Sequence, residues 1–128
     1  MSGRRSTPGS GNDAGDGQPL TLRGLQDVVD GWITAYGVRY FSELTNLAVL
    51  MEEVGELARI MARTYGDQSF KSAQERGDLA DEMADVLFVL VCLANQTGVD
   101  LEQAVSTNLS KKTHRDRHRH RNNPKLSS

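Results

Sequence analysis

The chain has 128 residues, which suits one domain and argues against two, because domains usually contain about 100–150 residues. The charged fraction is 25%, an ordinary value that excludes a chain disordered throughout. The longest apolar run, Val86 to Ala94, is too short to cross a bilayer, and the N-terminus lacks the apolar stretch of a signal peptide. The single cysteine, Cys92, excludes an intrachain disulfide and a cysteine-based zinc site, so we expect a cytoplasmic protein.

The charge is distributed unevenly along the chain. Residues 1–109 contain 8 Lys and Arg against 16 Asp and Glu, a net charge of −8, whereas residues 110–128 contain 7 against 1, a net charge of +6. All three histidines, His114, His118 and His120, also lie in this basic end. An acidic body followed by a basic segment indicates either a nucleic-acid-binding arm or part of a site whose ligand needs both signs of charge.

The first helix is predicted after a polar leader. Residues 1–19 are rich in Gly, Pro and Ser and bury too little apolar surface to offset the entropy of ordering, so we expect them to be disordered. An apolar stripe with helical spacing follows and stops before Gly37; it consists of Leu22, Leu25, Val28, Val29, Trp32, Ile33 and Tyr36. Trp32 belongs to this stripe, and we expect it in the core.

Two longer helices follow. The second is predicted from the N-cap Ser42 to Gly66, and residues 66–76 form a polar connection without periodicity. The third is predicted over residues 75–97 and stops at Gly98. Because the C-terminal half of the third helix is apolar on nearly every side, we expect it to be the most buried element.

A fourth helix completes the predicted fold. Asp100 followed by Gln103 resembles a capping box and starts a helix that continues into the basic segment. No stretch alternates with a period of two, so the predicted fold class is all-α, a bundle of four to five helices. The second and third helices carry apolar residues on more than one face, and this surplus predicts dimerisation through them.

Two pairs of carboxylates lie on successive predicted helices. Glu53 and Glu56 are three residues apart on the second helix and share one face. Glu82 and Asp85 have the same spacing on the third helix. Both pairs border apolar positions, so antiparallel packing of the two helices would bring four carboxylates together. Such a cluster takes up either protons or cations, and an all-oxygen ligand set without His or Cys suits Mg²⁺.

The spacing alone leaves an alternative open, because glutamates at helical intervals are also common on solvated faces. Few cations are placed to neutralise the two pairs, since only Arg59 and Arg63 follow on the second helix. The residues themselves therefore leave a metal site and a solvated acidic face as two open interpretations.

The order of the carboxylates resembles a family signature. Glu52-Glu53-x-x-Glu56, a spacer of 25 residues and then Glu82-x-x-Asp85 are similar to the EExxE…ExxD pattern of the MazG-like nucleotide pyrophosphohydrolases, in their short single-domain branch. The flanking segments are similar as well, and the resemblance covers roughly residues 22–118; these segments are Tyr40-Phe41-Ser42, Glu56-Leu57-Ala58-Arg59, Asp85-Val86-Leu87-Phe88-Val89-Leu90 and Leu93-Ala94-Asn95.

The resemblance implies a fold, an assembly and an activity. It implies a MazG-like helical domain over residues 20–116 and a homodimer or dimer of dimers. Outside the resemblance, we expect residues 117–128 to be a basic and flexible tail. The implied activity is Mg²⁺-dependent hydrolysis of a nucleoside triphosphate to the monophosphate and pyrophosphate, with Mn²⁺ as an alternative ion and nucleotide-pool house-cleaning as the role.

The resemblance also implies residue roles. The Mg²⁺ ligands would be Glu53, Glu56, Glu82 and Asp85. Glu52 would be the catalytic base that orients the attacking water, or an additional ligand.

The basic segment offers candidates for phosphate binding. Lys111 and Arg115 resemble the Lys…Arg-Asp element that follows the fourth helix in this branch, and their i,i+4 spacing lets both reach one substrate. A solvated helix end is the alternative interpretation. The stretch from Arg117 to Arg121 exceeds the family pattern, and we expect it to be a soluble tail with neither a membrane nor a nucleic acid as partner. A nucleic-acid or polyphosphate arm and an adventitious metal-binding tract are the alternative interpretations. The rival function is a non-catalytic helical dimer that senses nucleotides or binds nucleic acid through this tail.

Overall fold

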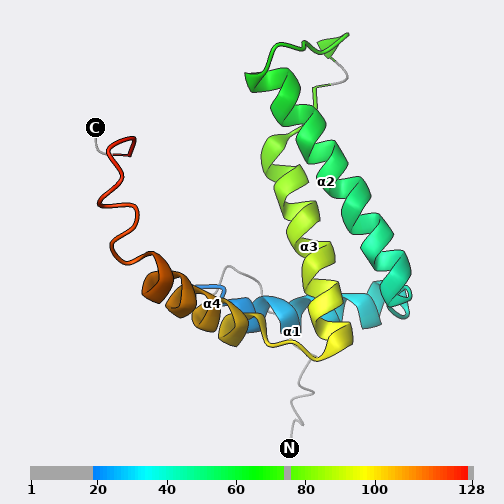
Figure 1. Ribbon diagram of the computed structural model, residues 1–128. Coiled ribbons are helices and arrows are strands. Elements are labelled where there is room, and N and C mark those ends of the chain that lie inside the picture. The colour runs from blue at the N-terminus through cyan, green and yellow to red at the C-terminus, as the bar shows by residue number, and fades with distance from the viewer. Residues whose placement is uncertain (1–18, 74–75, 127–128) are drawn as a thin grey trace, which may run out of the picture.

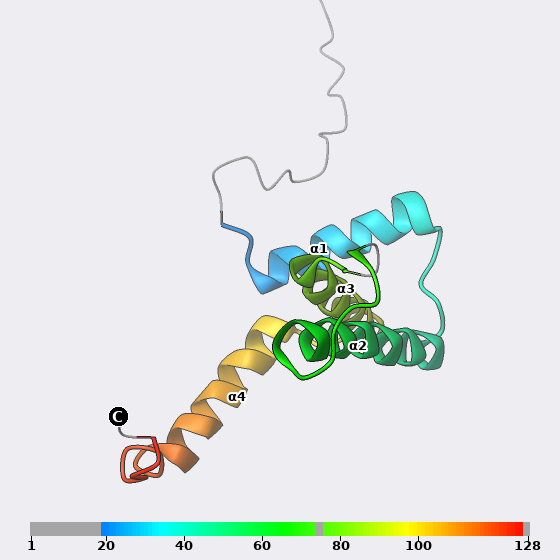
Figure 2. The ribbon, with the colours of Figure 1, turned by 90° about the horizontal axis from the view of Figure 1, so that it is seen from above.

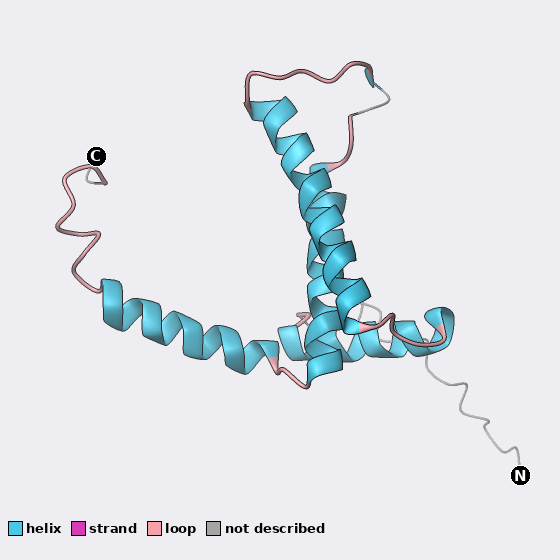
Figure 3. Ribbon diagram, turned by 45° about the vertical axis from the view of Figure 1, so that its right-hand side comes forward, coloured by secondary structure: helices cyan, strands magenta, loops and turns pink. Residues whose placement is uncertain are grey.

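The computed structural model describes residues 19–73 and 76–126. The described chain contains no strand, which confirms the all-α class (Figure 3). Most of the leader expected over residues 1–19 lies outside the described residues. The elements in chain order are α1 (Leu22–Trp32), a short π-helical segment η1 (Ile33–Gly37), α2 (Glu43–Tyr65), α3 (Leu79–Thr97) and α4 (Leu101–Asp116).

The helices α2 and α3 form an antiparallel hairpin (Figure 1). The helix α2 begins after Ser42, whose side chain accepts a hydrogen bond from the backbone N–H of Thr45, and it ends at Gly66. Both predicted ends of α2 are therefore confirmed.

The start of α3 differs from the sequence prediction. The helix begins at Leu79 rather than near residue 75, because the side chain of Asp78 accepts hydrogen bonds from the backbone N–H groups of Ala80 and Asp81. Satisfying N–H groups that have no partner inside the helix is what an N-cap does.

The two helices approach closely where α3 begins. A Cβ atom at Gly77 would lie 2.6 Å from Cδ1 of Ile60, which is buried on α2. A side chain there would force the buried side chain of Ile60 to shift.

The core is small and is centred on α3, as predicted. Four residues of α3 are buried, namely Val89, Val91, Cys92 and Ala94. The helix α1 adds Val29, which clusters with Val91 and Cys92. Burial raises the pKa of the Cys92 thiol, which keeps it in the un-ionised form. Cys92 is therefore a buried hydrophobic residue rather than a nucleophile.

The expectation that Trp32 lies in the core is wrong. Its side chain is 49% exposed, and its indole packs edge-on against Phe88 of α3 with ring centroids 5.6 Å apart. The helix α1 crosses the base of the hairpin and runs on past α3 (Figure 2). Trp32 is the last residue of α1, and its other ring contact is with the exposed Tyr36.

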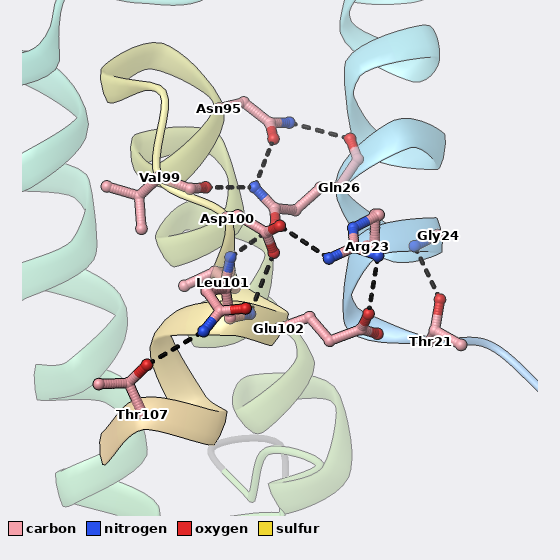
Figure 4. Close-up of polar contacts among 11 residues, drawn as sticks. Thr21, Arg23, Gly24, Gln26, Asn95, Val99, Asp100, Leu101, Glu102 and Thr107 are labelled. Carbon is pink, nitrogen blue, oxygen red and sulfur yellow. Dashed lines mark hydrogen bonds and ion pairs between the residues drawn. The ribbon is translucent and has the colours of Figure 1, made fainter.

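A buried amide network joins α1 to the end of α3. Gln26, which is 8% exposed, donates hydrogen bonds to Oδ1 of Asn95 at 3.1 Å and to the carbonyl oxygen of Val99 at 2.8 Å (Figure 4). Its own amide oxygen accepts a hydrogen bond of 2.8 Å from the backbone N–H of Leu101, at the first turn of α4. Asn95 in turn donates to the backbone oxygen of Gln26 and to the hydroxyl of Tyr40, both at 3.0 Å.

A sharp elbow separates α3 from α4. Gly98 adopts a left-handed conformation with φ of 71°, which a residue with a side chain rarely adopts, and α3 and α4 make an angle of 103°. Asp100 caps α4 by accepting from the backbone N–H of Gln103, and it is paired with Arg23 of α1 at 2.8 Å (Figure 4). The helix α4 therefore leaves the base of the hairpin and runs away from it (Figures 1 and 2).

Among the described residues, no single helix is both long and apolar enough to cross a membrane. The bent pair formed by α3 and α4 satisfies the length and composition requirement only when the two helices are taken together.

Replacing Asn95 with alanine tests the amide network. The change leaves the buried side chain of Gln26 without one partner, and an unsatisfied buried polar group costs about 1–3 kcal/mol. We expect the free energy of unfolding in urea to fall by about 2 kcal/mol. The control Asn108→Ala, at an exposed position of α4, should change it by less than about 0.5 kcal/mol. Equal effects of the two substitutions would contradict the role of the network.

Candidate active site

The hairpin brings three of the predicted carboxylates together. Glu53 lies on α2, and Glu82 and Asp85 lie one turn apart on the first half of α3. Each contributes one carboxylate oxygen, and these three oxygens all lie within 4.8 Å of one another. We call Glu53, Glu82 and Asp85 the acidic cluster. Each member is partly buried, so the cluster sits at the seam between the helices rather than on a fully solvated face.

The electrostatics of the cluster are unfavourable for three negative charges. Burial raises the pKa of Glu82 above its ordinary value, and the nearby charges of Glu53 and Asp85 raise it further. The Oε2 atom of Glu82 is shielded from solvent and has no hydrogen-bond partner among the described residues. A buried carboxylate oxygen of this kind needs a proton or a cation.

The donor set fits a hard divalent cation. Three carboxylates converge from two helices, and no imidazole or thiol belongs to the group. Mg²⁺ prefers oxygen ligands, and it is commonly held by a few carboxylates together with water and substrate phosphates. Of the described residues, this is the group whose geometry could hold a metal ion.

Glu56 lies at the border of the cluster. It is exposed, and its Oε2 atom is 3.1 Å from Nη2 of Arg59 one turn later. Its charge still contributes to the raised pKa of Glu82. The i,i+3 spacing of Glu56 and Arg59 is the sequence signal for this pair, although Arg59 was predicted only as a cation that follows the carboxylates.

Glu52 is exposed, next to the cluster on α2, and its carboxylate is not part of the converging group. The predicted phosphate-binding pair lies on another element. Lys111 and Arg115 are exposed on the last turns of α4, which runs away from the hairpin (Figure 1). Within one chain, α4 thus leads these two residues away from the carboxylates.

Arg115 already has a partner in the structure. Its guanidinium donates to Oδ2 of Asp116, with the shorter contact at 2.7 Å, and this pair raises the pKa of Arg115. Arg119 contacts the other oxygen of Asp116 at 3.3 Å. The pairing of Asp116 with two arginines was not predicted from the sequence.

Comparison with known proteins shows which family the sequence matches. The model of the MazG nucleotide pyrophosphohydrolase domain matches residues 41–120, which include all five carboxylates of the sequence signature and both α4 candidates. The chain belongs to this family.

Proteins of Bacillus subtilis strain 168 are similar to this MazG chain in sequence. YpjD is 40% identical over 99 residues, which are 77% of this chain and 89% of YpjD. YvdC is 35% identical over 94 residues, 69% of this chain and 83% of YvdC.

Two solved structures share the fold. The crystal structure of YpjD from Bacillus subtilis has a TM-score of 0.69 and 39% identity, and the match covers 77% of this chain and 99% of that one. The crystal structure of a Bacillus-conserved MazG protein, described as a nucleotide pyrophosphohydrolase, has a TM-score of 0.62 and 36% identity, with 73% and 90% coverage. The MazG-like helical fold predicted from the sequence is therefore confirmed.

The pKa of Glu82 leads to a stability prediction for the metal-free protein. A carboxyl group whose pKa is higher in the folded than in the unfolded state binds more protons when folded, so stability falls as pH rises from about 4.5 through the raised value. Glu82→Gln removes this titration, since the amide stays neutral. We expect the variant in EDTA to melt at a higher temperature than the parent at pH 7, with the difference shrinking toward pH 4.5. A difference that does not depend on pH would refute the assignment of the repulsion to Glu82.

Proposed function

We propose that this protein is a Mg²⁺-dependent nucleoside triphosphate pyrophosphohydrolase. It converts an NTP or dNTP and water into the monophosphate and pyrophosphate by cleaving the bond between the α-phosphorus and the oxygen that bridges to the β-phosphorus. The observation that carries the proposal is the convergence of Glu53, Glu82 and Asp85, with one buried oxygen of Glu82 lacking a partner, in a member of the MazG family.

Mg²⁺, or Mn²⁺ in its place, is the proposed cofactor. Glu53, Glu82 and Asp85 would hold it, and Glu56 would join them after exchanging its contact with Arg59. The bound ion would supply positive charge to the phosphate oxygens and lower the pKa of a water molecule. The cluster matches this role because its own carboxylates would otherwise repel a triphosphate.

Glu52 is the proposed general base. Its exposed position beside Glu53 leaves it accessible to solvent and to a substrate bound over the seam. There it would accept the proton of the attacking water while the water oxygen bonds to the α-phosphorus. The electron pair of the broken bond leaves with pyrophosphate.

Phosphate binding by Lys111 and Arg115 calls for a second subunit in this proposal. The helix α4 of one chain points away from its own acidic cluster, so the two cations would reach the cluster of a partner (Figures 1 and 3). Arg115 would then exchange Asp116 for a substrate phosphate, to which its planar guanidinium can donate two hydrogen bonds.

The exposed apolar surface supports an assembly of this kind. Five large apolar side chains on α2 are exposed, and they recur at intervals of three, four or seven residues; they are Leu44, Leu47, Met51, Val54 and Met61. The helix α3 adds Met83, Leu87 and Leu90. Such a repeat is typical of helices that pack against another helix, so we propose a homodimer or a dimer of dimers in which α2 and α3 form the contact.

The cellular role proposed for this reaction is removal of unwanted nucleotides from the pool, in the cytoplasm. What supports this role is the match to the MazG nucleotide pyrophosphohydrolase domain.

The metal requirement provides the main test. We expect pyrophosphate release from a panel of NTPs and dNTPs to depend on Mg²⁺ or Mn²⁺ and to stop in EDTA, because the acidic cluster has no other counter-charge for a triphosphate. Asp85→Ala should lower kcat by at least about a hundredfold, the usual effect of losing a major electrostatic stabiliser. The measurement is a coupled pyrophosphate assay at saturating substrate.

Asp81→Asn is the matched control, since Asp81 is an exposed carboxylate on the same helix outside the acidic cluster. It should leave kcat within about threefold of the parent value. Near-normal turnover of Asp85→Ala, or undiminished turnover in chelator, would refute the proposed site. Absence of turnover with every nucleotide would favour the nucleotide-sensing alternative.

The assembly has its own test. Light scattering at micromolar concentration should give at least twice the chain mass of 14.1 kDa. Met51→Glu places a charge in the exposed stripe of α2 and should yield monomers, because burying an unpaired charge is costly. Val105→Glu, at a similarly exposed position of α4, should leave the mass unchanged. A monomeric parent protein would contradict the proposal.

A further inference from the structure

A concave site lies at the basic end of the molecule, and no residue of the acidic cluster lines it. An open cavity of about 640 Å³ forms where the last turn of α4 meets the turns that follow it. This volume lies within the range of about 300–1,000 Å³ that is typical of small-molecule sites. Its lining includes Lys112, Asp116, Arg117, His118, His120 and Arg121.

The backbone after α4 gathers these side chains around one space. The N–H of Arg119 donates to the carbonyl oxygen of Asp116 at 3.1 Å, and the N–H of Asn122 donates to that of His118 at 3.1 Å. A third turn closes with the N–H of Asn123 donating to the oxygen of His120 at 3.2 Å. The chain thus winds back on itself here instead of extending as a strand with its cations in a row.

The single carboxylate of the lining is already neutralised. Asp116 accepts hydrogen bonds from Arg115 at 2.7 Å and from Arg119 at 3.3 Å, and the hydrogen bond from Arg115 is the main cause of its lowered pKa. Asp116 therefore acts as an internal counter-ion for two arginines that do not line the cavity. The cations that do line it, Lys112, Arg117 and Arg121, face no other carboxylate of the lining.

We propose that this cavity binds a compact, multiply charged phosphate anion, such as inorganic pyrophosphate, inorganic triphosphate or the phosphate chain of a nucleotide. Arginine guanidinium groups bind phosphate oxygens with paired, charge-assisted hydrogen bonds. A compact anion can meet several converging cations at once, whereas a polymer needs them spread along a track. Lys111 and Arg115, the proposed substrate contacts, do not line the cavity, although Arg115 is paired with its Asp116. Anion binding in the cavity does not depend on the proposed reaction.

Chelator separates this site from the acidic cluster. In EDTA the carboxylates of Glu53, Glu82 and Asp85 repel anions, so heat of binding reports on the cations of α4 and of the turns after it, and the variants below assign it to the cavity. The experiment is calorimetric titration of the full chain with inorganic triphosphate in EDTA at low ionic strength. We expect binding that weakens as salt is added, because exposed charges are screened.

Variants locate the binding. Arg117→Ala/Arg121→Ala should raise the Kd for triphosphate by at least about tenfold, because two charge-assisted contacts are lost. Arg39→Ala/Lys125→Ala removes the same charge outside the cavity and should change the Kd by less than about twofold. Asp85→Asn should leave the Kd unchanged, and circular dichroism should show intact helices in every variant.

Four results would overturn the inference. They are no binding in EDTA, equal weakening by the two double variants, weakening by Asp85→Asn, or binding of a single-stranded oligonucleotide of about twelve nucleotides more than about tenfold tighter than triphosphate. The last result would identify a nucleic-acid surface instead. Turnover of the Arg117→Ala/Arg121→Ala variant with Mg²⁺ is measured in parallel. Loss of anion binding in this cavity can then be told apart from loss of the proposed reaction.

Discussion

The antiparallel packing of α2 against α3 is the contact on which the rest of the molecule depends. It buries Ile60 in the narrow space beside Gly77. It also sets the position along the helix axes at which Glu53 meets Glu82 and Asp85. The apolar contacts of the hairpin must therefore supply the free energy that holds like charges together. A bound cation removes this repulsion, so the hairpin is more stable when the acidic cluster holds a cation than when it is empty.

The described chain buries few side chains for its length. Its buried hydrophobic residues are six, and several large apolar residues of α2 and α3 are exposed on the other faces of the hairpin. A hairpin crossed by one helix at its base has only one layer of packing, so it offers two sides for further contacts (Figure 2). This open architecture explains why polar anchors such as Gln26 and Asn95 hold α1 in place, where a larger core would use apolar packing.

Much of this fold could be predicted from local sequence signals. Ser42, Gly66, Gly98 and Asp100 mark helix ends through backbone chemistry that operates within a few residues, and all four predictions are confirmed. Trp32 could not be placed in the same way, because its burial depends on how far α1 runs past α3, a long-range property that the apolar stripe does not encode.

The candidate site also has features that local sequence signals predict and features that depend on longer-range geometry. The spacing of Glu82 and Asp85 is local, and their meeting with Glu53 follows once the two helices are taken as antiparallel. The contacts of Glu56 with Arg59 and of Asp116 with two arginines depend on side-chain conformations that compete with solvent. The direction of α4 depends on one left-handed residue, and periodicity contains no information on an angle between helices.

That elbow at Gly98 makes α4 a lever. A helix of 16 residues is about 24 Å long, so a deflection of about 10° at its base moves its far end by about 4 Å. Arg23 of α1 is paired with both Asp100 and Glu102, at the start of α4. A shift of these contacts changes the angle of α4 more than the same shift farther along the helix would. A small movement of α1 therefore produces a larger displacement of the cationic end of α4.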